Sequence, residues 1–544
     1  MDQLPLLSLV VVTPFIASLI ISALPAQPVT IPRQVAFWLS LIPFFLSLLV
    51  LAAFDPTVGT LQLTESVPWM PSLGINYSVG VDGFSLWLIL LTTFLTPVVI
   101  LAAWTDIQHR VKEFMFFMLL LESGMLGALV ATDLFLFFMF WELMLFPMVF
   151  VIGIWGGPRR RYAAIKFVIY TMAGSALMLV AMLYLVLTHA KTGQLSFDIL
   201  TLYDTKLSYT EQTFLFWAFA IAFMIKVPMV PFHTWLPDAH TEAPTGGSVD
   251  LAGVLLKMGA YGFLRFALPM FPLAAQDAFP WIIGLAVVGI IYGAMVSLPQ
   301  ADMKRLVAYS SVSHLGFVML GIYAFNRTGM TGGVLQMVNH GLSTGALFIL
   351  IGFIYDRRHT RQISQYGGLW AVVPIFSSLF LIVTLSSIGL PGLNGFVGEF
   401  LILLGAYRAH PWAAAIATLG VVLGAAYLLT MYKRVIFGPV THEENRSLKD
   451  LSAREIAAVA PVILLIFWIG IYPKPFLDRI EPTAAVLLQR LERAGADRHM
   501  GDKQRPLASV EDGQEEDEAQ LVREDDDARL AHNVTQATAT GELR

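Results

Sequence analysis

Cysteine is absent from the 544 residues, and charged side chains are scarce, at 13% of the sequence. The missing cysteine excludes disulfide bonds and cysteine-ligated iron–sulfur clusters. Eleven histidines remain as candidate haem or metal ligands, but the sequence has no HExxH motif or similar cluster. It also has no basic patch with interleaved aromatic residues of the kind that binds nucleic acid. We therefore expect no cofactor, no metal and no nucleic acid on this chain.

Apolar residues are abundant where charged residues are few. Hydrophobic residues make up 56% of the sequence, and about 20 of them in a helix cross a bilayer core of ~30 Å. Such runs recur from Leu4 to about Tyr472, which predicts an all-α polytopic membrane protein. We expect fourteen transmembrane helices, near residues 4–23, 35–54, 82–103, 113–131, 133–154, 163–188, 213–230, 249–269, 280–298, 304–323, 332–354, 371–407, 412–437 and 456–474.

Lysine and arginine are unevenly distributed over the predicted loops. With the N-terminus outside, the inside loops hold sixteen of them: Arg33, Arg110, Lys112, Arg159, Arg160, Arg161, Lys304, Arg305, Arg357, Arg358, Arg361, Lys433, Arg434, Arg446, Lys449 and Arg454. The outside loops hold four: Lys191, Lys206, Arg327 and Arg408. Because short cytoplasmic loops retain Lys and Arg, both termini are predicted to be extracytoplasmic. The loop 55–80, which has neither residue, fits an outside location.

The sequence changes character after residue 475. Residues 484–494 fit one short amphipathic helix, and acidic runs follow at Glu511–Glu518 and Glu524–Asp527. A self-repelling segment without aromatic residues cannot bury a core. We therefore predict residues 481–544 to be an acidic, disordered tail.

Seven ionisable residues lie deep inside predicted spans, although each costs at least ~2.5 kcal/mol at the centre of a bilayer. One of them interrupts the apolar run LFLFFMFWELMLFPM at residues 134–148. The seven are Glu122, Glu142, Lys226, Lys257, His314, His340 and Glu399. Such groups, spread over a helix bundle, are what a proton path requires, because burial and neighbouring charges tune each one to hold and release a proton.

Structural roles compete with this interpretation. Glu142 and Lys226 alternatively form a static ion pair that locks two helices. Each buried histidine is alternatively a neutral residue bonded to a neighbour, and Glu122 alternatively reaches a helix end. Two further charges are best explained by position: Asp250 as a helix cap, and Arg265 as a side chain that extends to the interface from near a helix end.

Two predicted helices are broken beside an ionisable residue. Lys226 precedes Pro228 by two positions, and Glu399 follows the sequence PGLNG at residues 391–395 by four. Non-helical backbone survives at membrane depth only where protein or water satisfies it. Each break lies in the fourth member of a five-helix group, which predicts two inverted repeats of the transporter type. The predicted divisions are residues 1–112 with helices 1–3, 113–272 and 273–437 as the two five-helix repeats and proton half-channels, 438–480 with helix 14, and 481–544 as the tail.

Four motifs carry a resemblance to a known family. Residues 226–245, KVPMVPFHTWLPDAHTEAPT, and residues 302–316, DMKRLVAYSSVSHLG, resemble the antiporter-like membrane-arm subunits of respiratory complex I. Residues 247–259, GSVDLAGVLLKMG, and residues 390–400, LPGLNGFVGEF, are similar to the NuoM-type chains of that family. At the position of Glu399 those chains have Glu, whereas the sister chains and the Mrp sodium/proton antiporters usually have Lys. The resemblance covers about residues 1–475, and Asp250 and the acidic tail depart from it.

The resemblance implies a redox-inactive, proton-translocating subunit of NADH:quinone oxidoreductase, driven by quinone reduction elsewhere in the complex. It implies that flavin, iron–sulfur clusters and quinone belong to partner subunits. The proton-transfer residues implied by position are the coupling pair Glu142 and Lys226, the central Lys257, the axis residues His314 and His340, and the exit-side Glu399, with Glu122 as a further candidate.

The implied partners are the other membrane-arm subunits, including the sister antiporter-like chains, and the lipid bilayer, without a soluble small-molecule substrate on this chain. The implied location is a bacterial plasma membrane. The alternative is a subunit of a multisubunit cation/proton antiporter, or of a membrane-bound hydrogenase or ferredoxin-linked complex. A stand-alone secondary transporter and a structural scaffold are the remaining alternatives, and the seven buried ionisable groups argue against the scaffold.

Overall fold

The computed structural model describes residues 4–191 and 193–503. Residues up to Leu491 belong to one compact unit, and those from Glu492 belong to a second. Within the described residues, eleven helical segments are long and apolar enough to cross a membrane. They are α1 (Leu6–Ala23), α2 (Thr30–Ala53), α4 (Val111–Val130), α5 (Leu134–Leu143) with α6 (Leu145–Trp155), α7 (Arg160–Ala190), the run from α11 to α13 (Thr245–Met270), α15 (Phe279–Ser297), α16 (Met303–Ile322), α17 (Arg327–Arg358), α20 (Pro411–Ile436) and α21 (Ala453–Ile471). The prediction of a helical polytopic membrane protein is confirmed.

The number of crossings stays a prediction. The three remaining predicted spans match helices outside that set: α3 (Leu86–Ala102), α9 (Tyr209–Lys226), and α18 (Pro374–Ser387) with α19 (Asn394–Ala409). Each predicted span therefore coincides with helical backbone, whereas fourteen crossings and two inverted repeats remain expectations from the sequence.

The segment Thr245–Met270 is an irregular helix. It consists of α11 (Thr245–Asp250), the π-helical turn η2 (Leu251–Leu255), α12 (Lys257–Gly262), the π-helical turn η3 (Phe263–Ala267) and α13 (Leu268–Met270). The short connecting elements are η1 (Pro71–Leu73), α8 (Ile199–Tyr203), α10 (Trp235–Glu242), α14 (Pro272–Asp277), η4 (Ile363–Gln365), η5 (Leu369–Ala371) and η6 (Glu443–Asn445). Because π-helical turns are frequent at functional sites, the turn η2, which ends two residues before Lys257, marks this segment for attention.

Both predicted helix breaks are confirmed. Helix α9 ends at Lys226 and α10 begins at Trp235, while α18 ends at Ser387 and α19 begins at Asn394. In the second break Gly389 and Gly392 have φ angles of 76° and 91°. Only glycine adopts such left-handed backbone without strain, so these glycines permit the irregular backbone between α18 and α19.

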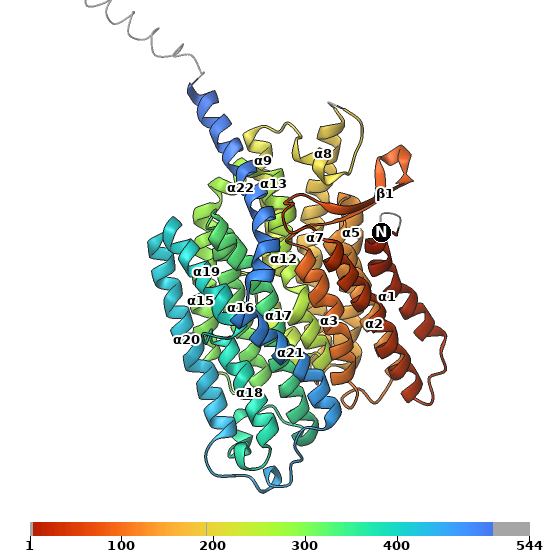
Figure 1. Ribbon diagram of the computed structural model, residues 1–544, viewed down its shortest axis with the longest axis vertical. Helices are drawn as coiled ribbons and strands as arrows, with labels where there is room; N and C mark the ends of the chain where they lie inside the picture. Colours follow the sequence, from red (N-terminus) through yellow and green to blue (C-terminus); the bar gives the residue numbers. More distant parts are fainter. Residues whose placement is uncertain (1–3, 192, 504–544) are drawn as a thin grey trace, which may run out of the picture. The chain divides into compact units, whose positions relative to one another are not determined.

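A two-stranded sheet corrects the all-helical expectation. In the loop 55–80, β1 (Gln62–Met70) pairs with β2 (Ile75–Val81) in antiparallel fashion, shown as orange strands in Figure 1. The turn ends at Gly74, whose φ of 66° requires glycine. The Glu65 carboxylate accepts hydrogen bonds from the Leu7 and Ser8 backbone N–H groups, at 2.8 and 3.1 Å. The hairpin therefore caps the N-terminus of α1.

The last helix is longer than predicted. Helix α22 spans Lys474–Lys503, so the short helix expected at 484–494 is part of it, and the predicted start of the tail at residue 481 is too early. The first part of α22 crosses from α3 to α13 in the same compact unit (Figure 1, blue). The Trp87 indole donates to the Phe476 carbonyl at 3.2 Å, and Arg490 Nε donates to the Pro269 carbonyl at 2.8 Å. The acidic tail from residue 504 lies outside the described residues.

Candidate functional site

A buried lysine and histidine contact each other at the centre of the bundle. Lys257 begins α12 and is 0% exposed, and His340 lies on α17 and is 3% exposed. Lys257 Nζ lies 2.7 Å from His340 Nδ1, and it also donates to the Ala252 carbonyl in η2. A Lys257 ammonium, which has only donors, would donate to Nδ1 of a neutral His340. Contact at this distance permits direct proton transfer between the two side chains.

A histidine and a carboxylate continue the path. His314 of α16 lies with Nδ1 at 3.1 Å from Oε1 of Glu399, which is on α19. The rings of His314 and His340 have centroids 5.7 Å apart. Lys257, His340, His314 and Glu399 therefore form a connected series, which we call the central chain. Four different helices contribute its members, although the residues are far apart in the sequence.

A water-sized cavity lies beside the two histidines. It has a volume of about 10 Å³ and is lined by His314, His340 and polar side chains of α17 and α18. A cavity of this size holds one water molecule when polar groups surround it. Since the two rings do not contact each other through ring nitrogens, one water in this cavity is the shortest bridge between them.

The sequence analysis missed the uncharged partners of the central chain. Gln336 Nε2 donates to Glu399 Oε1 at 3.2 Å, and Asn339 Nδ2 donates to the Asn394 carbonyl at the second helix break, at 2.8 Å. The Ser343 hydroxyl lies 2.6 Å from the Ser386 hydroxyl. The signal for these partners was present, because residues 336, 339, 340 and 343 have the spacing of one helix face.

The predicted coupling pair is apart in this structure. Lys226 is 2% exposed, and its Nζ lies 5.0 Å from the centroid of the Trp141 ring, a cation–π contact. Among the ion pairs of the described residues, none joins Lys226 to Glu142 within 4.0 Å, and Glu142 Oε1 is buried without a hydrogen-bond partner. Glu142 instead lines a pocket of about 550 Å³ together with Trp69 and Tyr77 of the hairpin. A static ion pair is therefore not formed in this conformation, and coupling between the two remains a prediction.

Replacing Glu142 with glutamine or alanine should severely reduce proton pumping while leaving assembly intact. The unpartnered carboxylate is the counter-charge available to Lys226, and neither replacement supplies a negative charge. Glu142→Asp keeps the charge and should retain part of the activity. NADH-driven proton uptake by membrane vesicles measures the effect, and normal pumping by Glu142→Ala would remove Glu142 from the proton path.

Three other buried charges differ from their sequence interpretation. Glu122 is at the middle of α4, 0% exposed, with both carboxylate oxygens unpartnered, so it does not reach a helix end. Asp250 is the last residue of α11 and has no capping bond; the N-cap of α11 is Pro244. Arg265 does not extend to the interface, because it is 7% exposed and its Nη2 lies 2.8 Å from Oδ2 of Asp82. Glu122 lies outside the central chain and interacts electrostatically with Asp250.

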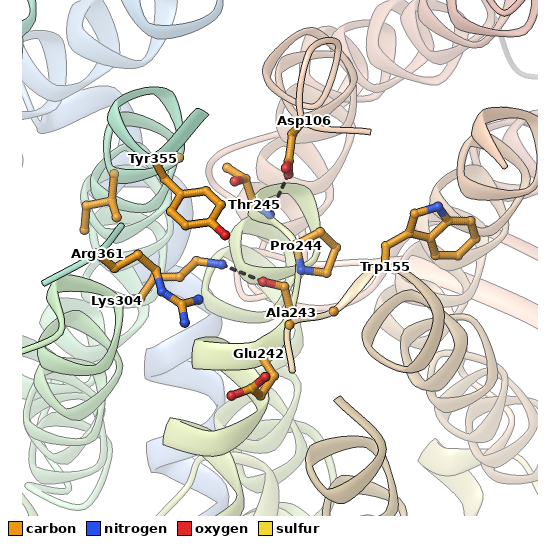
Figure 2. A pocket seen from close by; sticks show the side chains of 13 residues that line it. Asp106, Trp155, Glu242, Ala243, Pro244, Thr245, Lys304, Tyr355 and Arg361 are labelled. Atoms are coloured by element: carbon orange, nitrogen blue, oxygen red, sulfur yellow. Dashed lines mark hydrogen bonds between the residues drawn. The ribbon is translucent and has the colours of Figure 1, made fainter. Parts of the chain in front are cut away.

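A polar pocket of about 150 Å³ lies where α10 and α11 meet, and Figure 2 shows it. Lys304 points into it from α16 and donates to the Ala243 carbonyl at 2.6 Å, while the Thr245 N–H donates to Asp106 at 3.2 Å. Glu242 and Arg361 complete the charged lining. Lys304 is 4% exposed, which corrects its assignment to a loop. The pocket thus gathers opposite charges from helix ends and loops on the side predicted to face inside.

His240 lies near this pocket and was also missed. It belongs to α10, is 0% exposed, and stacks on Phe348 with ring centroids 4.7 Å apart. Neither ring nitrogen has a hydrogen-bond partner. It interacts electrostatically with both Lys304, which lines the pocket, and Lys257 of the central chain. In the described residues no three His, Asp or Glu side chains are grouped to hold a metal ion.

The chain is similar to proteins of one family over most of its length. Residues 131–424 match the family model described as "NADH:quinone oxidoreductase/Mrp antiporter, TM". A protein of Rhodobacter capsulatus named NADH-quinone oxidoreductase subunit M is 45% identical over 501 residues, which are 89% of this chain and 96% of that protein.

Two solved structures share the fold. A chain of respiratory complex I from Thermus thermophilus with bound NADH aligns with a TM-score of 0.82 and 32% identity, over 89% of this chain and 99% of that one. A chain of the Mrp complex from Dietzia sp. DQ12-45-1b aligns with a TM-score of 0.76 over 90% of this chain and 100% of that one. At 20% identity, the second likeness shows the fold alone.

Proposed function

We propose that this chain, which belongs to the NADH:quinone oxidoreductase/Mrp antiporter membrane family, is the proton-translocating subunit M of a respiratory complex I. Its partners are the other membrane-arm subunits. The observation that carries the proposal is the central chain, in which four titratable residues connect four helices inside the bundle.

The proton path runs along the central chain. Lys257 Nζ gives a proton to His340 Nδ1, and its lone pair remains on the amine. His340 then releases a proton from Nε2, which is buried without a partner, to one water in the neighbouring cavity. His314 takes the proton from that water and passes one from Nδ1 to Glu399 Oε1, 3.1 Å away. Gln336, which donates to the same oxygen, holds the carboxylate in place.

Lys226 and Glu142 couple this path to the rest of the complex. In this structure Lys226 Nζ lies over an aromatic ring, and among the described residues no carboxylate lies within ion-pair distance of it. Movement of Glu142 toward Lys226 adds a counter-charge, and its withdrawal favours transfer of the Lys226 proton toward Lys257. Glu142 lines an open pocket. A change of charge in a subunit bound at this pocket therefore acts electrostatically on Glu142. The polar pocket near Lys304, with His240 behind it, is the proposed entrance for protons from the inner side.

Electron transfer occurs in partner subunits. Cysteine is absent, so this chain holds no cysteine-ligated cluster, and we propose that it holds no flavin and no quinone chemistry. A role in a cation/proton antiporter is the alternative. Glu399 and the 45% identity to a subunit M favour complex I, whereas the solved Mrp chain is only 20% identical.

Purification of the tagged full-length chain in mild detergent tests this function. We expect it to copurify with flavin and iron–sulfur absorption and with NADH:quinone reductase activity, all of which should separate from the chain under conditions that dissociate the membrane arm. A purified assembly that contains cation/proton antiporter subunits and does not oxidise NADH would contradict the proposal. A stoichiometric chromophore that stays on the isolated chain would contradict its redox-inactive role.

Protease accessibility tests the proposed orientation, in which both termini face the extracytoplasmic side of a bacterial plasma membrane. The excess of Lys and Arg in the segments predicted to face inside supports this orientation. Protease added to right-side-out vesicles should remove the acidic C-terminal segment, detected as a mass loss of the chain. Protection there, combined with cleavage in inverted vesicles, would reverse the orientation.

A further inference from the structure

An apolar groove opens on the side of the bundle formed by α2, α3, α17, α21 and the start of α22. Its volume is about 660 Å³, and Arg479 is its one charged lining residue. Leu48, Leu91, Leu464 and Trp468 are among the apolar residues that line it. Since a water molecule occupies ~30 Å³, the groove has room for many atoms but offers polar partners at one end only.

The mouth of the groove faces the hydrocarbon region. Leu464 is 70% exposed and Trp468 is 50% exposed, on a helix that spans the membrane. Leu48 is 37% exposed on α2, another spanning helix. An apolar opening at this depth is in contact with acyl chains, because lipid is the solvent there.

The end of the groove formed by α22 is a site for a headgroup. Arg479 donates from Nη1 to the Pro475 carbonyl at 2.8 Å, while its Nε is buried without a hydrogen-bond partner. Among the described residues, no carboxylate lies within 4.0 Å of Arg479, and the adjacent Asp478 pairs with Lys474 at 2.6 Å. A guanidinium with free donors and no counter-ion matches a phosphate. Trp87, Trp468 and Phe476 surround this end with contacting rings, as aromatic residues do at the headgroup level of a membrane.

We propose that this groove binds one anionic phospholipid, with an acyl chain along α2, α3 and α21 and the phosphate at Arg479. The long apolar lining and the single charged residue of the groove together favour this occupant. A soluble anion would make no contact with the apolar lining, and an uncharged lipid would leave Arg479 without a counter-ion. An apolar side chain of a neighbouring subunit is the rival occupant, and the experiment distinguishes it.

Photo-crosslinking in membranes that contain the full assembled complex tests the proposal. The probes are phosphatidylglycerol and phosphatidylcholine, each with a diazirine on the acyl chain, and the crosslinks are mapped by peptide mass spectrometry. We expect phosphatidylglycerol to label peptides of α2, α3 and α21 that line the groove. Arg479→Gln should lower the labelling ratio of phosphatidylglycerol to phosphatidylcholine about fivefold, whereas Lys474→Gln, which removes a charge outside the groove, should not change it.

A second pair of variants tests the acyl-chain position. Leu48→Trp fills the mouth of the groove and should reduce labelling by both lipids, while Leu49→Trp, at an exposed neighbour that does not line it, should not. Equal labelling ratios in Arg479→Gln and the parent would overturn the proposal. So would lipid crosslinks that map to a neighbouring subunit and are absent from the groove residues of this chain.

Discussion

Replacing Lys257 with methionine should lower NADH-driven proton pumping by more than about tenfold, with the complex still assembled. Lys257 is completely buried and contacts both His340 Nδ1 and the Ala252 carbonyl. Methionine has similar length but no proton to give, so the central chain loses its first member. Lys257→Arg should fail too, because a guanidinium scarcely releases its proton.

Met258→Leu is the matched control for Lys257. Met258 is also 0% exposed on α12, and an exchange of similar volume in a core costs less than about 1.5 kcal/mol. Proton uptake by inverted vesicles, normalised to assembled complex on native gels, gives the comparison. Parental pumping by assembled Lys257→Met would show that protons bypass the contact with His340.

Glu399→Gln should have an equally large effect, again more than about tenfold. Glutamine keeps the shape and still reaches Gln336 and His314, but it cannot take up and release a proton in the way a carboxyl group does. Glu399→Asp and Glu399→Lys should each retain a measurable fraction, because both keep a titratable group. Glu399→Ala should fail as glutamine does.

Phe400→Leu serves as the control for Glu399, since Phe400 is the next residue on α19 and is half-exposed. Pumping and quinone reduction are to be measured in the same membranes. If Glu399→Gln pumps at the parental rate while assembled, Glu399 is not on the path, and its contacts with His314 and Gln336 are structural.

Membrane physics explains why the sequence was informative about the helices and the titratable residues. Long apolar runs are required to cross a bilayer, and broken helices at depth need compensation, so the breaks after Lys226 and before Glu399 were visible without a structure. Buried charges are costly, which singled out seven residues, and four of these form the central chain. Their order and contacts were not predictable, because they arise from packing between α12, α16, α17 and α19.

The features that the sequence analysis misassigned or missed have three different physical causes. Lys304 and Arg265 lie near helix ends, where a charge usually reaches water, but tertiary partners hold them inside: the Ala243 carbonyl and the Asp82 carboxylate. Gln336 and Asn339 carry no charge, so the cost argument that identifies acids and lysines did not identify them. The hairpin was not predicted, because a loop outside the bilayer does not need the length and apolar composition of a segment that crosses it.

The central claim is that protons cross this subunit through the chain from Lys257 to Glu399, and removing both ends at once tests it most directly. The measurement is NADH-driven proton uptake by inverted vesicles containing the assembled Lys257→Met/Glu399→Gln double variant. We expect severely reduced uptake, equal to that of the more damaged single variant, because groups in one serial path do not add their losses. An assembled double variant that takes up protons at the parental rate would contradict it.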